Sequence, residues 1–447
     1  MPGDIVSVQV GQCGNEIGNE FWKRLCMEHA IGHDGYATSE RCVPDQATTY
    51  FSMADGDRFV PRAVLIDLEP RVLNATKNSE FGQIFNIERV FHSPDGGGAG
   101  NNWATGYGAG WSGQSEVAEE ILNLIQSEVE ICDALDGFSL SHSIAGGTGS
   151  GLGSWVLEKL YDDFGQKSII TFSVFPSSGS DVVVQPYNAT LTLERLIEFP
   201  EMVVILDNDA ITRTAMTKMH IKNPTMGDVN AIIGRIMGGI TAPIRFGSYS
   251  YGSLGSLAAH LGPVSPLHFV QCGLAPLTMP NSRVPQRTYP ADLMQLLSRP
   301  DSIMTTPFNK FTAGQTDCLI AGAAIFQGPV KTSDVLEAMY TANTKASFGA
   351  SLQPFNDIDP ITTYPHAPSR SALLALNHSN FEKSLRRITE QYDKMFKNKA
   401  YINNFTKEEY FAEGLDRMAE AREKVEQLAR AYADPWRFCS PVDGDAE

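Results

Sequence analysis

The stretch SIAGGTGSGLGS, residues 143–154, is rich in glycine and lies between the apolar GFSL and the helix-like WVLEKLYDDF. Glycine allows positive φ angles and a close approach of the backbone, so several N–H groups can converge on the oxygens of an anion. The positive end of the following helix would face the same anion, and the hydroxyls of Thr148 and Ser150 would add two donors. A glycine run alone is more often a flexible turn, but the flanking strand and helix favour phosphate binding.

This loop departs from the two common phosphate-binding patterns. No Lys-Ser/Thr pair follows the glycines, and the third glycine of G-x-G-x-x-G is missing in every register. Bound phosphates would therefore rely on backbone amides and a divalent cation, which takes oxygen ligands directly or through water. Asp67 and Glu69 in DLEP, with Gln12 and Asn102 in neighbouring loops, can supply such oxygens. DLEP alone would more often be a helix start or a turn. The prediction that it binds a cation therefore rests on its place beside the other loops.

Short β-branched runs alternate with helical patterns through the first 210 residues and position these loops. Strands are expected at residues 5–10, 62–69, 138–144, 168–175 and 202–208. Between them, Leu152, Val156, Leu160 and Phe164 recur every four residues, which places them on one helical face. The alternation predicts an α/β fold with a mostly parallel sheet covered on both sides. Ligands of such a sheet bind beyond the carboxyl ends of its strands, where GQCGN, DLEP and GGGAGNN stand.

The second half of the chain repeats this pattern and then changes to helices. Residues 225–242 are expected to form one long, largely apolar helix that Gly238 and Gly239 interrupt. Further strands are expected at 267–274, 318–326 and 371–378. Apolar residues at helical spacing over 380–432 predict two antiparallel helices docked on the body. The final polar residues are expected to be disordered.

Composition narrows the classes of partner. The formal charge is −17, with 35 Lys+Arg against 52 Asp+Glu, so nucleic acid and anionic membranes are not expected as partners. The seven cysteines form no C-x-x-C pair, which favours reduced thiols over a disulfide framework or a zinc site. No signal peptide or membrane-spanning run is recognisable, so we expect a soluble intracellular protein.

Six motifs together resemble one family. GQCGN, AVLIDLEPRV, GGGAGNNWA, GGTGSG, VVVQPYN and LDN occur in the order found in the tubulin superfamily, along nearly the whole chain. Further segments look more like γ-tubulin than α- or β-tubulin: EFWKRLCMEHAI, HSIAGGTGSGLGS, SDVVVQPYN, IFQG and QYDKMFKNKAYINNF. The short tail SPVDGDAE also lacks the long acidic run that is typical of α- and β-tubulin.

The resemblance implies a Rossmann-like domain with a parallel sheet, a second α/β domain and a helical hairpin. The expected boundaries are a GTP-binding domain at 1–224, a central connecting helix at 225–246, an intermediate α/β domain at 247–379, a C-terminal helical domain at 380–436 and a short disordered tail at 437–447. This layout agrees with the alternation of strands and helices described above.

The resemblance also implies the ligands of the site, which are GTP or GDP with Mg²⁺. The phosphate-binding residues would be Gln12, Cys13, Gly100, Asn101, Asn102, Ala145, Gly146, Gly147, Thr148, Gly149, Ser150 and Gly151. Mg²⁺ would lie near Asp67 and Glu69, directly or through water, and the ribose by Asp181. Asn208 and Asn230 would read guanine, because an asparagine amide can pair with its donor and acceptor edge. No residue of the chain is expected to be catalytic.

Two positions depart from the family pattern. Met226 stands where tubulins usually carry a Tyr or Phe that stacks on guanine, and a thioether loses the aromatic overlap. Ser256 stands where α-tubulin carries an acid that promotes GTP hydrolysis on the neighbouring subunit, and serine cannot polarise water as a carboxylate does. The surrounding loop also departs from the γ-tubulin pattern.

The sequence therefore favours a γ-tubulin-like template for microtubule nucleation that caps minus ends at a microtubule-organising centre, the centrosome or spindle pole body, in the cytoplasm. Its expected partners are α/β-tubulin, scaffold proteins of γ-tubulin complexes and lateral copies of itself in a ring. GTP would be chiefly structural, with slow hydrolysis at most. Two alternatives stay open: a divergent α- or β-type lattice subunit and a self-activating GTPase switch. The switch is the least favoured, because no lysine, arginine finger or water-orienting carboxylate is identifiable.

Overall fold

The structure is a computed structural model, and it describes most of the chain. The described residues are 3–94, 96–111, 116–177, 179, 182–248, 251–277, 288–305, 318–344, 358–363 and 370–435. The expected disordered tail at 437–447 lies outside this range.

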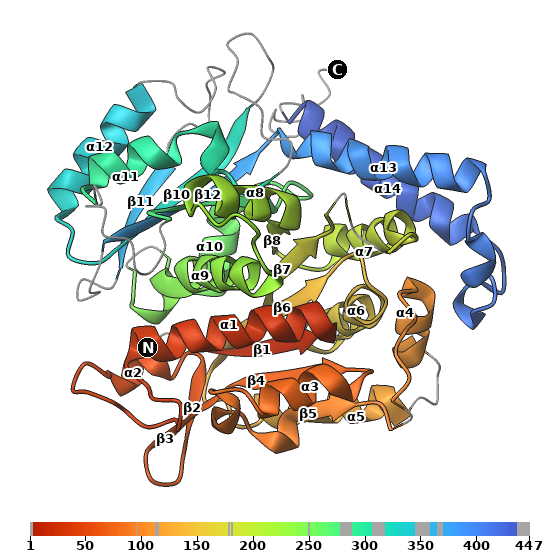
Figure 1. The fold of residues 1–447 in the computed structure, drawn as a ribbon, viewed down its shortest axis with the longest axis horizontal. Helices are drawn as coiled ribbons and strands as arrows, with labels where there is room; N and C mark the ends of the chain where they lie inside the picture. Colours follow the sequence, from red (N-terminus) through yellow and green to blue (C-terminus); the bar gives the residue numbers. More distant parts are fainter. Residues whose placement is uncertain are drawn as a thin grey trace, which may run out of the picture.

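A ten-stranded sheet runs through the molecule in the order β11-β10-β12-β9-β8-β7-β6-β1-β4-β5 (Figure 1). Its strands are β1 (Asp4–Val10), β4 (Ala63–Asp67), β5 (Val90–His92), β6 (Leu135–Ser143), β7 (Ser168–Phe175), β8 (Met202–Asp207), β9 (Phe269–Ala275), β10 (Leu319–Gln327), β11 (Ile358–Thr363) and β12 (Ser371–His378). The strands from β5 to β9 pair in parallel, as do β10 and β11, while β12 is antiparallel to β9 and β10. The mostly parallel α/β fold is confirmed.

Every strand expected from the sequence is present within a few residues. Strands β5 and β11, and the small hairpin of β2 (Phe51–Ala54) and β3 (Arg58–Pro61), were not expected. Three or four residues are too few to show a periodicity, so short strands such as β5, β2 and β3 escape pattern reading.

Helices cover the sheet. They are α1 (Gly11–His29), α2 (Pro44–Ala47), α3 (Pro70–Lys77), α4 (Trp103–Trp111), α5 (Glu116–Val129), α6 (Gly153–Phe164), α7 (Gln185–Glu198), α8 (Asn208–Lys218), α9 (Met226–Arg245), α10 (Leu254–Leu261), α11 (Pro290–Leu297), α12 (Thr332–Thr344), α13 (Phe381–Lys397) and α14 (Asp416–Ala433). Side chains of β1 alternate between two hydrophobic cores: Ile5 packs with α1, α8, α9 and α10, whereas Val6 and Val8 pack with α4 to α7, α13 and α14. The sheet is therefore buried on both faces, as parallel sheets are.

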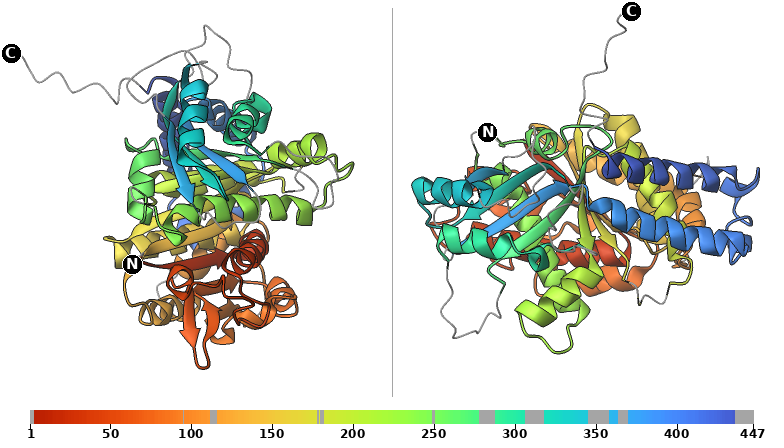
Figure 2. Two further views of the ribbon diagram at one scale, coloured as in Figure 1. Left: turned by 90° about the vertical axis from the view of Figure 1, so that its left-hand side faces the viewer. Right: turned by 90° about the horizontal axis from the view of Figure 1, so that it is seen from above.

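The two C-terminal helices lie side by side over α7 (Figure 2). Phe381, Leu385 and Ile388 of α13 and Met418 and Val425 of α14 are buried in the core that α7 shares. The docked helical pair expected over 380–432 is confirmed. Within the described residues, no helix is long and apolar enough to cross a membrane.

Helix α9 runs without a break from Met226 to Arg245, so the expected interruption at Gly238 and Gly239 is wrong. Thr225 and Asp228 form a capping box that starts the helix. A Cβ on Gly238 would lie 3.1 Å from Cγ of Arg24, and one on Gly239 would lie 2.8 Å from Cδ1 of Leu373. The glycines therefore let α9 pack closely against α1 and β12.

A buried ion pair joins the ends of α1 and α9. Nη2 of Arg245 donates to Oε2 of Glu28 at 2.6 Å and to the carbonyl of Gly238 at 2.6 Å, and Nη1 lies 2.9 Å from Nε2 of His29. Burial would raise the pKa of Glu28, but Arg245 and Arg24 outweigh it and hold that pKa below its usual value. Burial and Arg245 lower the pKa of His29 well below its usual range, so His29 is neutral at pH 7.

Replacing Glu28 with glutamine would leave the buried Arg245 guanidinium without a counter-charge. We expect Glu28→Gln to lower the free energy of unfolding by about 3 kcal/mol, as for other broken buried pairs. Urea titration of the full chain measures this change. Asp162→Asn, which breaks the solvent-exposed pair with Lys159, is the matched control and should cost less than about 0.5 kcal/mol. Equal losses in the two variants would contradict the prediction.

Candidate nucleotide-binding site

Three glycine-bearing segments touch at the carboxyl ends of the central strands. A Cβ on Gly11, where φ is +75°, would lie 2.8 Å from the backbone nitrogen of Gly149. A Cβ on Gly147 would lie 2.7 Å from Cβ of Ala99 and 2.8 Å from the nitrogen of Asn102. The start of α1, the segment 96–102 and the loop 145–151 therefore pack backbone against backbone. The residues predicted to bind phosphate from these segments are close together, and their role as ligands stays a prediction.

The glycine loop has a defined shape. Residues Thr148–Leu152 form a π-helical turn that leads into α6, and the nitrogen of Gly151 donates to the carbonyl of Gly147 at 2.8 Å. The hydroxyl of Ser150 is buried and donates to the carbonyl of Gly146. In the structure this hydroxyl therefore holds the loop itself, and its expected bond to a phosphate stays a prediction. The hydroxyl of Thr148, on a half-buried residue, stays a predicted donor.

Asn102 also has partners within the protein. Its amide nitrogen donates to the carbonyl of Asn404 at 2.9 Å, and its amide oxygen accepts from the nitrogen of Ala104 at 3.1 Å, which caps α4. In the structure this oxygen therefore caps α4, and its expected use for a cation stays a prediction. Gly100 and Asn101 beside it are exposed and have positive φ angles of 55° and 56°.

Asp67 and Glu69 form the acidic end of the site. Oδ1 of Asp67 accepts from the nitrogen of Glu69 at 3.2 Å, while Oδ2 is buried and has no hydrogen-bond partner among the described residues. Burial, with a smaller contribution from Glu69, raises the pKa of Asp67 to about 6. A Cβ on Gly98 would lie 2.0 Å from Oε1 of Glu69, so this carboxylate lies against the loop 96–102.

The unpartnered oxygen of Asp67 fits a hard cation. The described residues contain no group of three or more His, Cys, Asp or Glu side chains that could hold a metal ion. Mg²⁺ characteristically takes one or two carboxylates and completes its shell with water and phosphate oxygens. Asp67 and Glu69 would hold such an ion, and it would neutralise phosphate charge.

The predicted base-binding residues lie near the starts of α8 and α9, which pack against each other. Oδ1 of Asn208, at the first position of α8, is buried without a partner among the residues that the structure describes. Met226 opens α9 with 56% of its surface exposed, and Asn230 lies one turn further on and is buried. Asp181, the predicted ribose contact, lies outside the described residues.

Two protein-family models match this chain. The GTPase domain of the Tubulin/FtsZ family matches residues 4–216, and the tubulin C-terminal domain matches residues 265–389. The chain belongs to the tubulin superfamily. It is therefore a GTP-binding, tubulin-like cytoskeletal protein, and its glycine loop, Asp67 and Asn208 lie within the matched GTPase domain.

In this tubulin-superfamily protein, one buried amide joins the two glycine-bearing loops. Nδ2 of Asn188 on α7 donates to the carbonyls of Asn101 at 2.8 Å and Ala145 at 2.9 Å, while Oδ1 accepts from the nitrogen of Trp103 at 3.0 Å. The motif VVVQPYN contains Asn188, but sequence reasoning gave the residue no role. Its position in the sequence, three residues after the residue at which α7 begins, offered no sign of these distant partners.

The buried side chain of His142 contacts the backbone of the glycine loop. Its Nδ1 lies 3.0 Å from the carbonyl of Gly149, and its Nε2 lies 2.9 Å from Oγ of Ser173. Burial lowers the pKa of His142 to about 4, so the ring is neutral at pH 7. A carbonyl only accepts, so Nδ1 carries the proton and holds the Gly149 carbonyl away from the ligand side.

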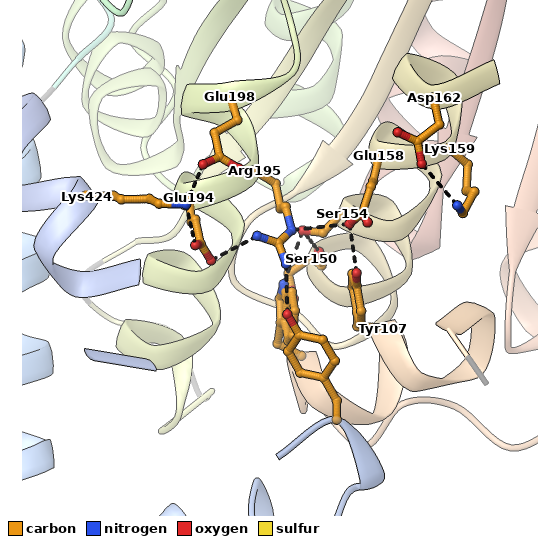
Figure 3. A network of polar contacts seen from close by, with 12 residues as sticks. Tyr107, Ser150, Ser154, Glu158, Lys159, Asp162, Glu194, Arg195, Glu198 and Lys424 are labelled. Atoms are coloured by element: carbon orange, nitrogen blue, oxygen red, sulfur yellow. Dashed lines mark hydrogen bonds and ion pairs between the residues drawn. The ribbon is translucent and has the colours of Figure 1, made fainter. Parts of the chain in front are cut away.

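A polar network continues from this loop to the C-terminal segments (Figure 3). Oγ of Ser154 donates to the carbonyl of Ser150 at 2.6 Å. Beside it, the hydroxyl of Tyr107 donates to Glu158 at 2.7 Å, and Glu158 lies 3.5 Å from Arg195. Arg195 also pairs with Glu194 at 3.0 Å and donates to Tyr410 at 2.9 Å, and Lys424 of α14 pairs with Glu194 at 2.9 Å. The helices around the phosphate loop are therefore tied to α14.

Removing the Asn188 amide would release both loops at once. We expect Asn188→Ala to lower the free energy of unfolding by about 2 kcal/mol, because the carbonyls of Asn101, Ala145 and Gly146 lose their donor and the buried nitrogen of Trp103 loses its acceptor. GTP affinity should fall at least about tenfold, because the loops no longer hold their spacing. The control is Thr190→Val, which removes a bond within the same helix and should leave affinity unchanged. An unchanged GTP affinity in Asn188→Ala would show that the loops keep their spacing without the amide.

Asp67 should lower stability in the absence of ligand. Its folded-state pKa of about 6 lies above the usual 3.8, so burial favours the protonated form, and the stabilising effect of this form is lost as pH rises through 6. At pH 7, Asp67→Asn should raise the free energy of unfolding of the nucleotide-free, chelator-treated protein by about 2 kcal/mol. The gain in the free energy of unfolding should be smaller at pH 4 than at pH 7. The variant should also bind GTP more weakly than the wild type in the presence of Mg²⁺. Urea titrations at both pH values check this, and a gain independent of pH would contradict it.

Proposed function

We propose that this protein is a γ-tubulin-like template for microtubule nucleation. It would cap minus ends at a microtubule-organising centre in the cytoplasm, held there by scaffold proteins with lateral copies of itself. The side chain at position 256 carries this proposal, and the γ-like segments add to it. The layout of a GTP-binding domain, a connecting helix, an intermediate domain and a C-terminal helical pair belongs to the same proposal.

The hydroxyl of Ser256 forms hydrogen bonds at the start of its own helix, α10. Its hydroxyl accepts from the nitrogen of Ser253 at 3.2 Å and donates to the carbonyl of Ser253 at 2.9 Å, and its nitrogen donates to Oγ of Ser253 at 3.2 Å. This capping box starts α10. A hydroxyl held in this way offers neither a negative charge nor a base for water, so the chain would not activate GTP hydrolysis on a neighbouring subunit.

The bound nucleotide would act chiefly as a structural ligand. The orphaned oxygens of Asp67 and Asn208 raise the free energy of the empty site, and GTP with Mg²⁺ would satisfy them. Occupancy would then fix the start of α1 and the two loops, and this shaped face would meet incoming α-tubulin. Hydrolysis would be slow, because the catalytic group would have to come from a neighbour.

Nucleation can be measured directly as the lag before αβ-tubulin assembly. Substoichiometric protein with a γ-tubulin-complex scaffold should shorten the lag, because a preformed row of subunits replaces the unfavourable nucleus. Asn188→Ala should shorten it less, because its GTP face is no longer held. An unchanged lag and unchanged minus-end dynamics would refute the proposal.

A divergent α- or β-type lattice subunit is the second candidate. Met226 would serve either role, but the γ-like segments count against a lattice subunit. Tagged protein at minus ends and organising centres supports the template, whereas incorporation along whole filaments, in amounts comparable with the other subunits, supports the lattice subunit.

A further inference from the structure

Glu16 lies between two amide side chains of the nucleotide site. Its Oε1 accepts from Nε2 of Gln12 at 2.9 Å, and its Oε2 accepts from Nδ2 of Asn230 at 3.1 Å. Gln12 is one turn before Glu16 on α1, whereas Asn230 comes from α9. One carboxylate therefore joins the predicted phosphate end of the site to the predicted base end.

A carboxylate dictates how both amides are turned. It has two oxygens and no hydrogen at neutral pH, so it only accepts, and each amide must present its NH₂ group to it. The carbonyl oxygen of each amide then points away from Glu16. A glutamine in the same place would carry one oxygen and one NH₂ group. With its oxygen still accepting from Gln12, its NH₂ group would face Asn230, and the Asn230 amide would turn round.

The fixed amide of Asn230 suits one class of purine. Oδ1 of Asn208, on α8, is an amide oxygen and therefore also an acceptor, and it is buried without a partner in the part of the chain that the structure describes. Two acceptors match the N1–H and 2-amino donors of guanine. Adenine offers an acceptor at N1 and no donor at C2, and hypoxanthine lacks the 2-amino group, so both would leave an acceptor unpaired.

We propose that Glu16 is a specificity-determining residue that selects purine nucleotides with a 2-amino group by fixing the Asn230 amide with its oxygen toward the base. This inference rests on the proposed reading of guanine by Asn208 and Asn230. Glu16 acts through Asn230 and does not itself touch the base. Met226 is not expected to provide this selectivity, because an exposed thioether contributes little to distinguishing one purine from another.

The test compares three triphosphates on nucleotide-stripped, full-length protein at fixed Mg²⁺: GTP, ITP, which lacks the 2-amino group, and XTP, which carries an oxygen there. All three have the same phosphates, so ratios of dissociation constants cancel any change in phosphate repulsion. In Glu16→Gln, the preference for GTP over ITP should fall about tenfold, because Asn230 turns its NH₂ group toward the base. XTP should gain relative to GTP. Glu20→Gln, one turn further along α1, is the matched control and should keep the wild-type ratios.

A double variant separates orientation from mere disruption. In Glu16→Gln with Asn230→Asp, the new glutamine donates to the new aspartate and still accepts from Gln12, so an acceptor faces the base again. The preference for GTP over ITP should return to within about twofold of the wild type. This variant also keeps the test decisive if Glu16→Gln alone fails to fold, which thermal melting of each protein reports.

Unchanged selectivity in Glu16→Gln, or no recovery in the folded double variant, would overturn this inference and leave the nucleotide site and the proposed nucleation intact. A wild-type protein that binds GTP and ITP equally would overturn both this inference and the reading of guanine by the two asparagines. The nucleation assay does not depend on these ratios, so a failure of the proposed nucleation can be distinguished from a failure of the inference about Glu16.

Discussion

One buried amide supports the two loops that are predicted to bind phosphate. Asn188 reaches from α7 to the carbonyls of residues 101 and 145 and to the nitrogen of Trp103, so it sets the spacing between two loops that have little side-chain bulk of their own. Glycine-bearing segments give a close backbone approach but lose much conformational entropy on ordering. The site therefore combines loops that can follow a ligand closely with supports, Asn188 and His142, that belong to rigid helices and strands.

These supports contrast with the groups left unsatisfied. Asp67 keeps one buried oxygen without a partner, and so does Asn208, although nearby asparagines such as Asn102 and Asn188 are fully engaged. Other described side chains, such as Gln9 and Tyr50, also have buried polar atoms without partners, but Asp67 and Asn208 lie where a ligand with a cation is predicted to bind. The structure is preorganised at a cost in its own stability, which a ligand with a cation and hydrogen-bond donors would offset.

Most of the fold was predictable, because buried strands and amphipathic helices show their periods in the sequence, as the eight expected strands did. The approximate place of the site was predictable too, since loops after parallel strands share one edge of the sheet. What side chains do there was harder to predict. The partners of Ser150, Asn102 and Glu16 come from carbonyl groups or distant helices that leave no sequence pattern. The expected interruption of α9 at its glycines was wrong for the same reason: the glycines allow α1 and β12 to pack closely against α9, and these neighbours leave no pattern in the sequence.

The bond from Asn102 to the carbonyl of Asn404 spans 302 residues of sequence, and Thr105 reaches Glu408 in the same way at 2.8 Å. A chain emerging from the ribosome presents its GTPase half first, with the glycine loop and both acidic residues already made. The segment 96–102 is then still missing its outer support. The candidate nucleotide site thus reaches its final form only after the segment around residues 404–408 has been made. A GTPase domain without that segment would consequently hold the loop 96–102 less firmly.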